Sequence, residues 1–251
     1  MKTRIILSGC NGAMGHVISD SVQKRSDCTI VAGVDLHPGN APDFEVFDAP
    51  DKVTVEADVI VDFSHPTALI PLLHAATDKK LPIVVCTTGL SSEHTEAMKT
   101  ASQKIAVFHS GNMSLGINLM IALAKKAADV LGTDFDIEII EKHHNRKLDA
   151  PSGTALMLAN AINETLDNRL RYEYDRHVRR EKRPKNELGI HAVRGGTIVG
   201  EHEVIFAGPD ELVTISHSAR SRDVFATGAI NAALFLADKG AGLYDMSDLL
   251  A

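Results

Sequence analysis

Short apolar strands alternate with amphipathic helices through the first half of the chain. The run Arg4–Ser8 ends at Gly9, and the stretch Ala13–Lys24 repeats its apolar side chains at helical spacing. The same order returns with strands at Thr29–Val34, Val59–Phe63, Ile83–Cys86 and Ala106–His109 and helices at Thr67–Lys79, Ser91–Ser102 and Leu115–Leu131. Because parallel strands need crossover helices between them, this pattern predicts an α/β fold with a doubly wound parallel sheet covered on both faces.

The pattern changes past about residue 132. Apolar residues alternate with polar ones at Phe135, Ile137 and Ile139, and again within Gly189–Val193, Ile198–Ala207 and Leu212–Ala219. Alternation of this kind is typical of strands with one wetter face, so we expect a second, α+β domain with a mostly antiparallel or mixed sheet. An alanine-rich helix at Val224–Ala237 follows. We expect a first domain of residues 1–114, to which the segment 222–251 returns, and a second of residues 115–221.

Composition excludes several classes of protein. A chain of 251 residues with a formal net charge of −7 is a poor candidate for general nucleic-acid binding. The basic segment Arg169–Lys185 lacks interleaved aromatic residues and is interpreted as a solvated loop. Three cysteines without CxxC spacing favour a reducing compartment, and the opening MKTRIILS is too short for a signal peptide or a membrane span. We expect a cytoplasmic protein with no membrane partner.

A glycine turn follows the first strand. Gly9-Cys10-Asn11-Gly12-Ala13-Met14-Gly15 has the spacing GxxGxxG at the entrance to a helix, where free backbone amides can bind a pyrophosphate. Asp35 ends the second strand about 20 residues further on, where an acid can accept hydrogen bonds from ribose hydroxyls. This combination predicts a dinucleotide site. Leu36 and His37 come next with no arginine to receive a 2′-phosphate, which favours NADH over NADPH.

The segment Glu141–Ala155, EKHHNRKLDAPSGTA, concentrates cationic and titratable residues before a predicted helix start. Free amides near Pro151–Thr154, with Arg146 and Lys147, suit a substrate carboxylate. His143, His144 or Lys147 could supply a proton, and the sequence leaves open which one does. Neighbouring histidines point in different directions on an extended chain and no acid or cysteine cluster accompanies them, so no metal site is expected.

Several motifs together resemble one family, the 4-hydroxy-tetrahydrodipicolinate reductases, also called dihydrodipicolinate reductases. EKHHNRKLDAPSGTA is close to the family signature E-x-H-H-x-x-K-x-D-x-P-S-G-T-A and is the most specific piece. The glycine turn, VDFSHP at Val61–Pro66, the TTG turn at Thr87–Gly89 and NMSLGIN at Asn112–Asn118 also match, so that the resemblance runs nearly end to end.

The resemblance implies a Rossmann-type dinucleotide-binding domain and a mixed domain that binds substrate and builds a homotetramer. It implies that NADH or NADPH reduces a small cyclic dicarboxylate to tetrahydrodipicolinate, with loss of water, in lysine and diaminopimelate synthesis. It assigns acid/base catalysis to His143, proton donation to Lys147, and substrate carboxylate binding to His144, Gly153 and Thr154. The implied cofactor residues are Gly9, Asn11, Gly12, Ala13, Met14, Gly15, Asp35, Cys86, Thr87, Thr88, Ser110, Gly111, Asn112 and Met113.

Three positions depart from the family pattern. Cys86 stands where the family often has glycine, Leu36 where many members have arginine, and Met113 where a bulkier aromatic residue is usual. Two other functions stay open. A related dehydrogenase acting on an amino-acid-derived or sugar substrate would need the glycine turn but not HHNRKLDAPSGT. A dinucleotide sensor without activity would have no need for both His143 and Lys147.

Overall fold

The computed structural model describes residues 1–37, 43–132, 134–177 and 179–250. The chain divides into two compact units. Unit 1 consists of Met1–Leu115 and Arg222–Ala251, and unit 2 consists of Gly116–Ser221. Within the described ranges, no helix is long and apolar enough to cross a membrane.

Unit 1 is built on a parallel sheet in which, among the described residues, seven strands have the order β12-β6-β5-β4-β1-β2-β3. Every pairing is parallel. The strands are β1 (Thr3–Ser8), β2 (Cys28–Val34), β3 (Glu45–Phe47), β4 (Val59–Asp62), β5 (Ile83–Val85), β6 (Ala106–His109) and β12 (Gly242–Tyr244). The order reverses between β1 and β4, which creates a crevice at the carboxyl ends of these strands. The predicted doubly wound parallel sheet is confirmed.

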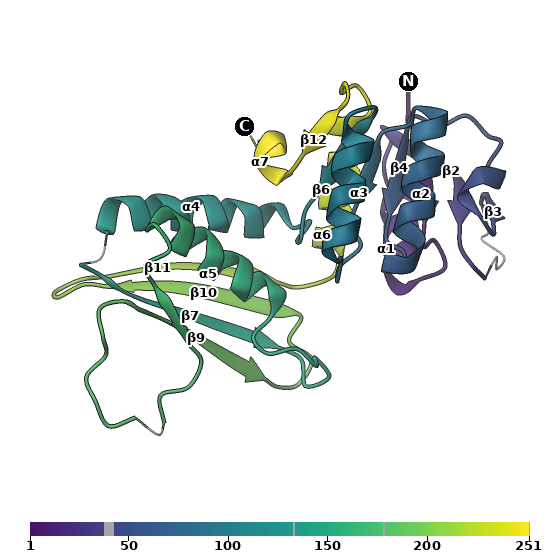
Figure 1. Ribbon diagram of the computed structural model, residues 1–251. Coiled ribbons are helices and arrows are strands. Elements are labelled where there is room, and N and C mark those ends of the chain that lie inside the picture. The colour runs from purple at the N-terminus through teal and green to yellow at the C-terminus, as the bar shows by residue number, and fades with distance from the viewer. Residues whose placement is uncertain (38–42, 133, 178, 251) are drawn as a thin grey trace. The chain divides into compact units, whose positions relative to one another are not determined.

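Helices cover both faces of this sheet (Figure 1). On one face α1 (Ala13–Gln23) and α6 (Asp223–Leu236) pack against side chains such as Ile5 and Leu7. On the other face α2 (Pro66–Lys79) and α3 (Ser92–Ser102) pack against Ile6 and its neighbours. Alternate residues of one strand thus enter two separate cores, which explains why the strands read as continuous apolar runs.

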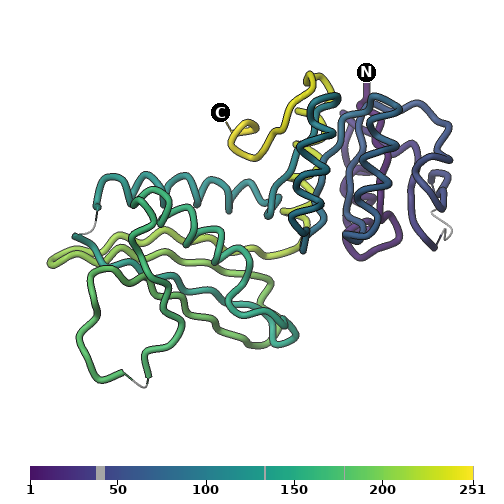
Figure 2. Tube along the Cα trace, in the orientation of Figure 1, coloured from purple at the N-terminus to yellow at the C-terminus, as the bar shows by residue number. Residues whose placement is uncertain are grey.

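The C-terminal segment is part of unit 1. Figure 2 shows its yellow trace lying beside the helices and strands formed by the first half of the chain. α6 contacts α1 as well as β4, β5 and β6. β12 pairs with β6 at the edge of the sheet, and the short helix α7 (Met246–Leu250) follows it. Residues far apart in sequence therefore share one core.

Unit 2 has a mixed sheet, whose five strands in the described part of the chain follow the order β11-β10-β7-β9-β8. The pairs of β10 with β7 and β11 are antiparallel, whereas those of β9 with β7 and β8 are parallel. The strands are β7 (Asp136–His143), β8 (Arg171–Glu173), β9 (Glu187–Arg194), β10 (Gly200–Ala207) and β11 (Leu212–Ala219). The sheet is mixed because helix α5 (Gly153–Thr165) lies between β7 and β9 in the chain and lets them run parallel.

Helices α4 (Leu115–Leu131) and α5 lie on one face of the unit 2 sheet (Figure 1). Along β7 burial alternates strictly, and Ile137, Ile139, Glu141 and His143 point to the covered face. Ile137 and Ile139 join the apolar core with residues of both helices. The same alternation therefore carries two polar side chains, Glu141 and His143, into a buried position at the end of the strand.

Arginines of the basic segment Arg169–Lys185 form specific contacts with the unit 2 sheet. The guanidinium of Arg183 donates to Glu138 and Asp136 on β7 at 2.9 and 3.0 Å and to the carbonyl oxygens of Ile137 and Glu187. Arg176 also pairs with the buried carboxylate of Glu187. Acidic side chains of the unit 2 sheet thus bind arginines of this segment, and the expectation of a merely solvated loop is wrong at these residues.

One glycine of α6 marks a close packing contact in unit 1. A Cβ added at Gly228 would overlap the carbonyl oxygen of Met113. Alanine in place of a helical glycine normally stabilises by about 1 kcal/mol, but overpacking against backbone costs about 1–3 kcal/mol. We expect Gly228→Ala to lower the melting temperature in thermal unfolding. Gly240→Ala is the control, because nothing lies within 4 Å of its added Cβ. Equal melting temperatures for the two variants would contradict this packing.

Candidate functional site

The glycine turn brings the backbone of β1 and α1 into close contact. Gly9 has φ +76, and a Cβ there would lie 2.6 Å from the carbonyl oxygen of Phe63. A Cβ at Gly15 would overlap the carbonyl oxygens of Gly9 and Cys10. The N-cap residue of α1, Gly12, provides no side-chain cap and the first turn holds no acid. The amino end of α1 is thereby shaped for an anionic group from outside the chain.

Asp35 stands beside this turn, just past the end of β2. Its carboxylate accepts hydrogen bonds from the backbone N–H groups of Asn11 and His37, each at 3.1 Å. The side-chain amide of Asn11 in turn donates to the carbonyl oxygen of His37 at 2.6 Å. Leu36 is 72% exposed. These contacts fix the acid next to the glycine turn, while its oxygens keep lone pairs for further donors.

A pocket of about 460 Å³ lies at the carboxyl ends of the central strands of unit 1. It brings together ten of the residues predicted to contact a cofactor: Gly12, Ala13, Met14, Cys86, Thr87, Thr88, Ser110, Gly111, Asn112 and Met113. Gly9, Asn11, Gly15 and Asp35 are not among its lining residues, and they belong to the turn and the strand end beside it. Sequence reasoning missed four lining residues, which are Phe63, Ser64, Arg222 and Phe225.

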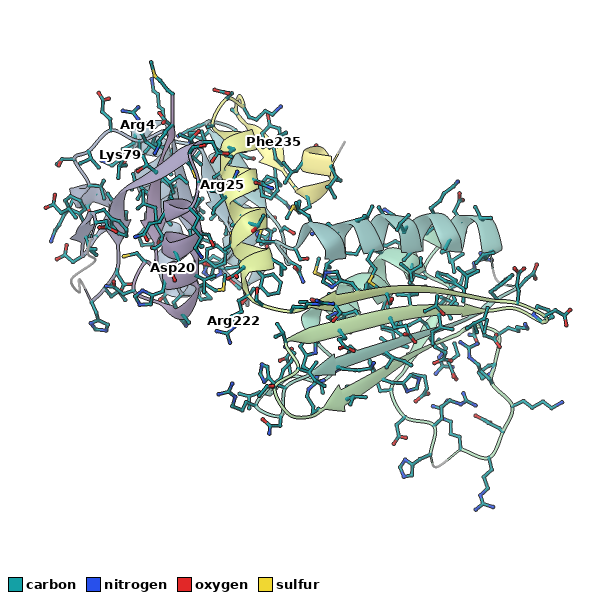
Figure 3. The ribbon with its side chains drawn as sticks, turned by 180° about the vertical axis from the view of Figure 1, so that it is seen from behind. Arg4, Asp20, Arg25, Lys79, Arg222 and Phe235 are labelled. Atoms are coloured by element: carbon teal, nitrogen blue, oxygen red, sulfur yellow. The ribbon has the colours of Figure 1, made fainter. Side chains whose placement is uncertain are left out.

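Two different signals could have found the missed residues. Phe63 and Ser64 belong to the motif VDFSHP, which had been recognised without a role for its members. Arg222 and Phe225 come from the return of the chain into unit 1, where Arg222 directly precedes α6 (Figure 3). A cationic side chain that lines a predicted nucleotide pocket is the type of residue that binds phosphate or carboxylate.

Asp62 lies buried beneath this pocket at the end of β4. Its carboxyl group accepts from the N–H of Ser64 at 3.1 Å and contacts Thr87 Oγ1 at 2.7 Å. Thr87 Oγ1 also lies 3.1 Å from the carbonyl oxygen of Ser64. Burial raises the pKa of Asp62, whereas the hydrogen bonds that it accepts from Ser64, Thr87 and Ser8 act in the opposite direction.

In unit 2 the carboxylate of Glu141 is fully buried and receives four hydrogen bonds. His143 Nδ1 lies 2.6 Å from Oε2, and the N–H of Ser152 donates to Oε1 at 2.9 Å. Arg194 donates to both oxygens, at 2.7 and 2.6 Å. Burial by itself would raise the pKa of Glu141, but the bonds from Arg194, His143 and Ser152 outweigh it and hold that pKa below its usual range.

His143 is buried at the end of β7, with 9% of its surface exposed. Desolvation lowers its pKa; the neighbouring Glu141 acts in the opposite direction, and the charges of Lys147 and Arg194 add to the lowering. The net shift is downward, so the imidazole is neutral at pH 7. The ring of His202 on β10 meets it edge-on, with ring centroids 5.2 Å apart.

The turn between β7 and α5 holds the remaining residues of the signature. Lys147 Nζ pairs with Asp149 at 2.9 Å, and the carbonyl oxygen of Asp149 accepts from Arg194 at 2.7 Å. Nδ1 of His144 is buried without a hydrogen-bond partner among the described residues. At Gly153, where α5 begins, nothing lies within 4 Å of an added Cβ. A polar atom without a partner and an open helix start are what an anionic ligand requires.

The residues described above lie in regions of the chain that two family models match. Residues 3–113 match the family model described as dihydrodipicolinate reductase, N-terminus, and residues 116–250 match the one described as dihydrodipicolinate reductase, C-terminus. The chain belongs to the dihydrodipicolinate reductase family. The resemblance inferred from the sequence motifs is thereby confirmed.

Relatives match this family member along its whole length. The 4-hydroxy-tetrahydrodipicolinate reductase of Caldanaerobacter subterraneus subsp. tengcongensis is 53% identical, over 100% of this chain and 99% of that protein. The protein of the same name from Clostridium tetani is 49% identical, over 100% of this chain and 98% of its own length. The glycine turn of unit 1 and the segment Glu141–Ala155 of unit 2 both fall within these matches.

Solved structures share the fold of this dihydrodipicolinate reductase family member. The dipicolinate-bound dihydrodipicolinate reductase of Paenisporosarcina sp. TG-14 has a TM-score of 0.80 at 24% identity, covering 98% of both chains. The DAP dehydrogenase of C. glutamicum, in complex with DAP, has a TM-score of 0.58 at 15% identity, covering 100% of this chain and 96% of that one. At these identities the likeness establishes the fold.

The surroundings of His202, which packs against His143, allow a test of the buried polar residues of unit 2. Ser152 Oγ accepts from the N–H of Ala155 and lies 3.1 Å from His202 Nε2, while His202 Nδ1 has no partner among the described residues. Burial, followed by the positive charge that His143 acquires on protonation, lowers the pKa of His202 to about 4. The unfolded chain takes up this proton near pH 6.5, the ordinary value of histidine.

Between pH 6.5 and 4 the unfolded state therefore binds more protons at this site than the folded state, and stability falls as the pH falls. The shift corresponds to about 3 kcal/mol. We expect the unfolding free energies of the wild type and His202→Gln to converge by about that amount as the pH drops from 6.5 to 4. Urea unfolding at several pH values measures it. A constant difference would mean that His202 titrates normally.

Proposed function

We propose that this protein reduces 4-hydroxy-tetrahydrodipicolinate to tetrahydrodipicolinate with a nicotinamide cofactor, in lysine and diaminopimelate biosynthesis. The observation that carries the proposal is the full-length match, at about half of all positions, to reductases that bear this name. The match includes both the glycine turn of unit 1 and the Glu141–Ala155 segment of unit 2. An oxidoreductase of this family has use for both halves, whereas a sensor would need only the first.

The chemistry of unit 1 fits a dinucleotide. Gly9 and Gly15 have no room for a Cβ, so the backbone at the amino end of α1 is not covered by their side chains. The pocket beside this turn is large enough for part of a cofactor. When bound, the reduced nicotinamide supplies the hydride. We assign the pyrophosphate to residues Gly9 to Gly15, the ribose to Asp35, and the nicotinamide half to Cys86, Thr87, Thr88 and the segment Ser110–Met113.

The environment of Asp35 favours NADH over NADPH. An acidic side chain held by the backbone N–H groups of Asn11 and His37 accepts hydrogen bonds from ribose hydroxyls but is a poor neighbour for a 2′-phosphate. The sequence from Leu36 to Pro42 contains no lysine or arginine that could offset this repulsion. Arg222, on the pocket lining, is the cationic side chain available in that pocket, and we assign it to the substrate or to the phosphates.

In unit 2 we assign the substrate carboxylates to His144, Gly153 and Thr154 at the start of α5. Reduction of an imine requires a proton as well as a hydride. His143, at the end of β7, and Lys147, in the turn that follows, both precede this helix start in the chain, and we assign acid/base catalysis to His143 and proton donation to Lys147. Family resemblance also supports a homotetramer in the cytoplasm, with unit 2 forming the contacts between subunits.

Oxidation of NADH and NADPH at 340 nm tests the proposed function. The substrate is supplied fresh from pyruvate and aspartate semialdehyde through a coupling synthase. We expect rapid oxidation that depends on the synthase product, with a higher kcat/KM for NADH than for NADPH. Cofactor binding without product-dependent oxidation would overturn the reductase assignment, and a preference for NADPH would overturn the role given to Asp35.

Lys147→Ala tests the proton donor. We expect kcat to fall by about 10²–10⁴, the usual contribution of general acid catalysis, while NADH binding to unit 1 stays unchanged. Lys142→Ala is the matched control, because this nearby lysine forms a half-exposed ion pair with Glu201 that contributes little. An equal loss in both variants, or a loss of NADH affinity with Lys147→Ala, would contradict the assignment.

A further inference from the structure

The hydrogen bonds around Glu141 determine which nitrogen of His143 carries a proton. An ionised carboxylate can only accept hydrogen bonds, and Ser152 and Arg194 both donate to Glu141. His143 Nδ1, 2.6 Å from Glu141 Oε2, must therefore carry its hydrogen. A neutral imidazole has one N–H, and so Nε2 of His143 bears a lone pair.

The rest of the surroundings leaves Nε2 available. It has no hydrogen-bond partner among the described residues, and a Cβ added at Gly200 would lie 3.1 Å from it. Because Gly200, at the start of β10, has no side chain, this residue does not crowd Nε2. His143 and Arg194 are directly paired across β7 and β9, which places the guanidinium against Glu141.

We propose that Glu141 is a positioning residue that fixes His143 in the Nδ1–H tautomer and presents Nε2 as a proton acceptor, while Arg194 keeps Glu141 ionised. This inference rests on the catalytic role of His143 in the proposed function. It deepens that role, because in the resting neutral enzyme His143 offers a lone pair and not a proton. The proton for the reduced substrate then comes from another group, and Lys147 is the cationic side chain of the same turn.

The charged and titratable groups around His143 support a neutral resting state. Glu141 on β7 balances Arg194 on β9, and Lys147 lies on the turn beyond. From β10 the ring of His202 packs against His143; it is itself neutral at pH 7, as is His217 on β11, whose burial lowers its pKa. Of these groups, Glu141 favours the protonated imidazole, and Lys147 and Arg194 oppose it.

Nuclear magnetic resonance of the full-length protein labelled with ¹³C,¹⁵N-histidine distinguishes the two tautomers. The variant His143→Gln identifies the signals of His143 among the twelve histidines. At pH 7.5 the wild type should show the Nδ1–H form. In Glu141→Gln the amide oxygen can keep the bond from Ser152 only if its NH₂ faces His143, which favours the Nε2–H form. The His143 titration should also move to lower pH, because the charge that raises its pKa is lost.

Turnover gives the functional readout. We expect kcat of Glu141→Gln to fall by about 10²-fold or more, as expected when a catalytic histidine loses its orienting acceptor, with NADH binding unchanged. Glu187→Gln is the matched control. Glu187 is also buried and bound by arginines in unit 2, but among the described residues it has no histidine partner. Both variants should lose stability in thermal unfolding, and only Glu141→Gln should lose turnover.

The outcomes separate this inference from the proposed function. An Nε2–H tautomer in the wild type, or an unchanged tautomer in Glu141→Gln, overturns the positioning role whatever the activity shows. A switched tautomer with full turnover in both Glu141→Gln and His143→Gln overturns the catalytic assignment of His143 and the inference that depends on it. If turnover falls equally in Glu141→Gln and Glu187→Gln, Glu141 only stabilises the fold and the positioning role is overturned.

Discussion

The buried carboxylate of Glu141 is the charge around which unit 2 is organised. A carboxylate without exposed surface is costly unless every lone pair is satisfied, and removing one partner of such a pair typically costs about 3–5 kcal/mol. Arg194, Ser152 and His143 supply those partners from β9, the start of α5 and β7. One ion thus fastens the amino end of α5 to the sheet and fixes the histidine of the signature at the same time.

Unit 1 depends on a different constraint, which is close approach between backbone segments. Gly9 and Gly15 let the end of β1, the start of α1 and the loop after β4 meet where no Cβ fits. The approach leaves the amino end of α1 without an internal cap. Asp62 adds a buried link between the loops after β4 and β5 through Thr87. The departure from glycine at Cys86 is accommodated, since its side chain is buried in the core of this unit.

Elements with a clear apolar run or helical spacing were predictable from the sequence, down to the three-residue strand β5, which lies within the predicted Ile83–Cys86. The helix Leu115–Leu131 and the strand Ala106–His109 have the bounds that the pattern indicated. The three-residue strands β3, β8 and β12 have no such apolar run, and they exist because a neighbouring strand offers unpaired backbone groups. Alternation along β9 revealed a strand but could not reveal that it runs parallel to β7, because direction depends on the crossover that contains α5.

By itself the sequence determined the class of fold, the family, and the residues that lie next to one another in motifs, from the glycine turn to EKHHNRKLDAPSGTA. These signals are local, because turn geometry, helix starts and strand alternation involve residues a few positions apart. Only the tertiary structure decided that Arg194, 53 positions from Glu141, holds its carboxylate, that His202 packs on His143, and that Arg222 and Phe225 reach the pocket of unit 1. The protonation of Asp62, Glu141 and His143 was also decided by the tertiary structure. It depends on how deeply each side chain is buried and on the hydrogen-bond partners that the fold brings next to it.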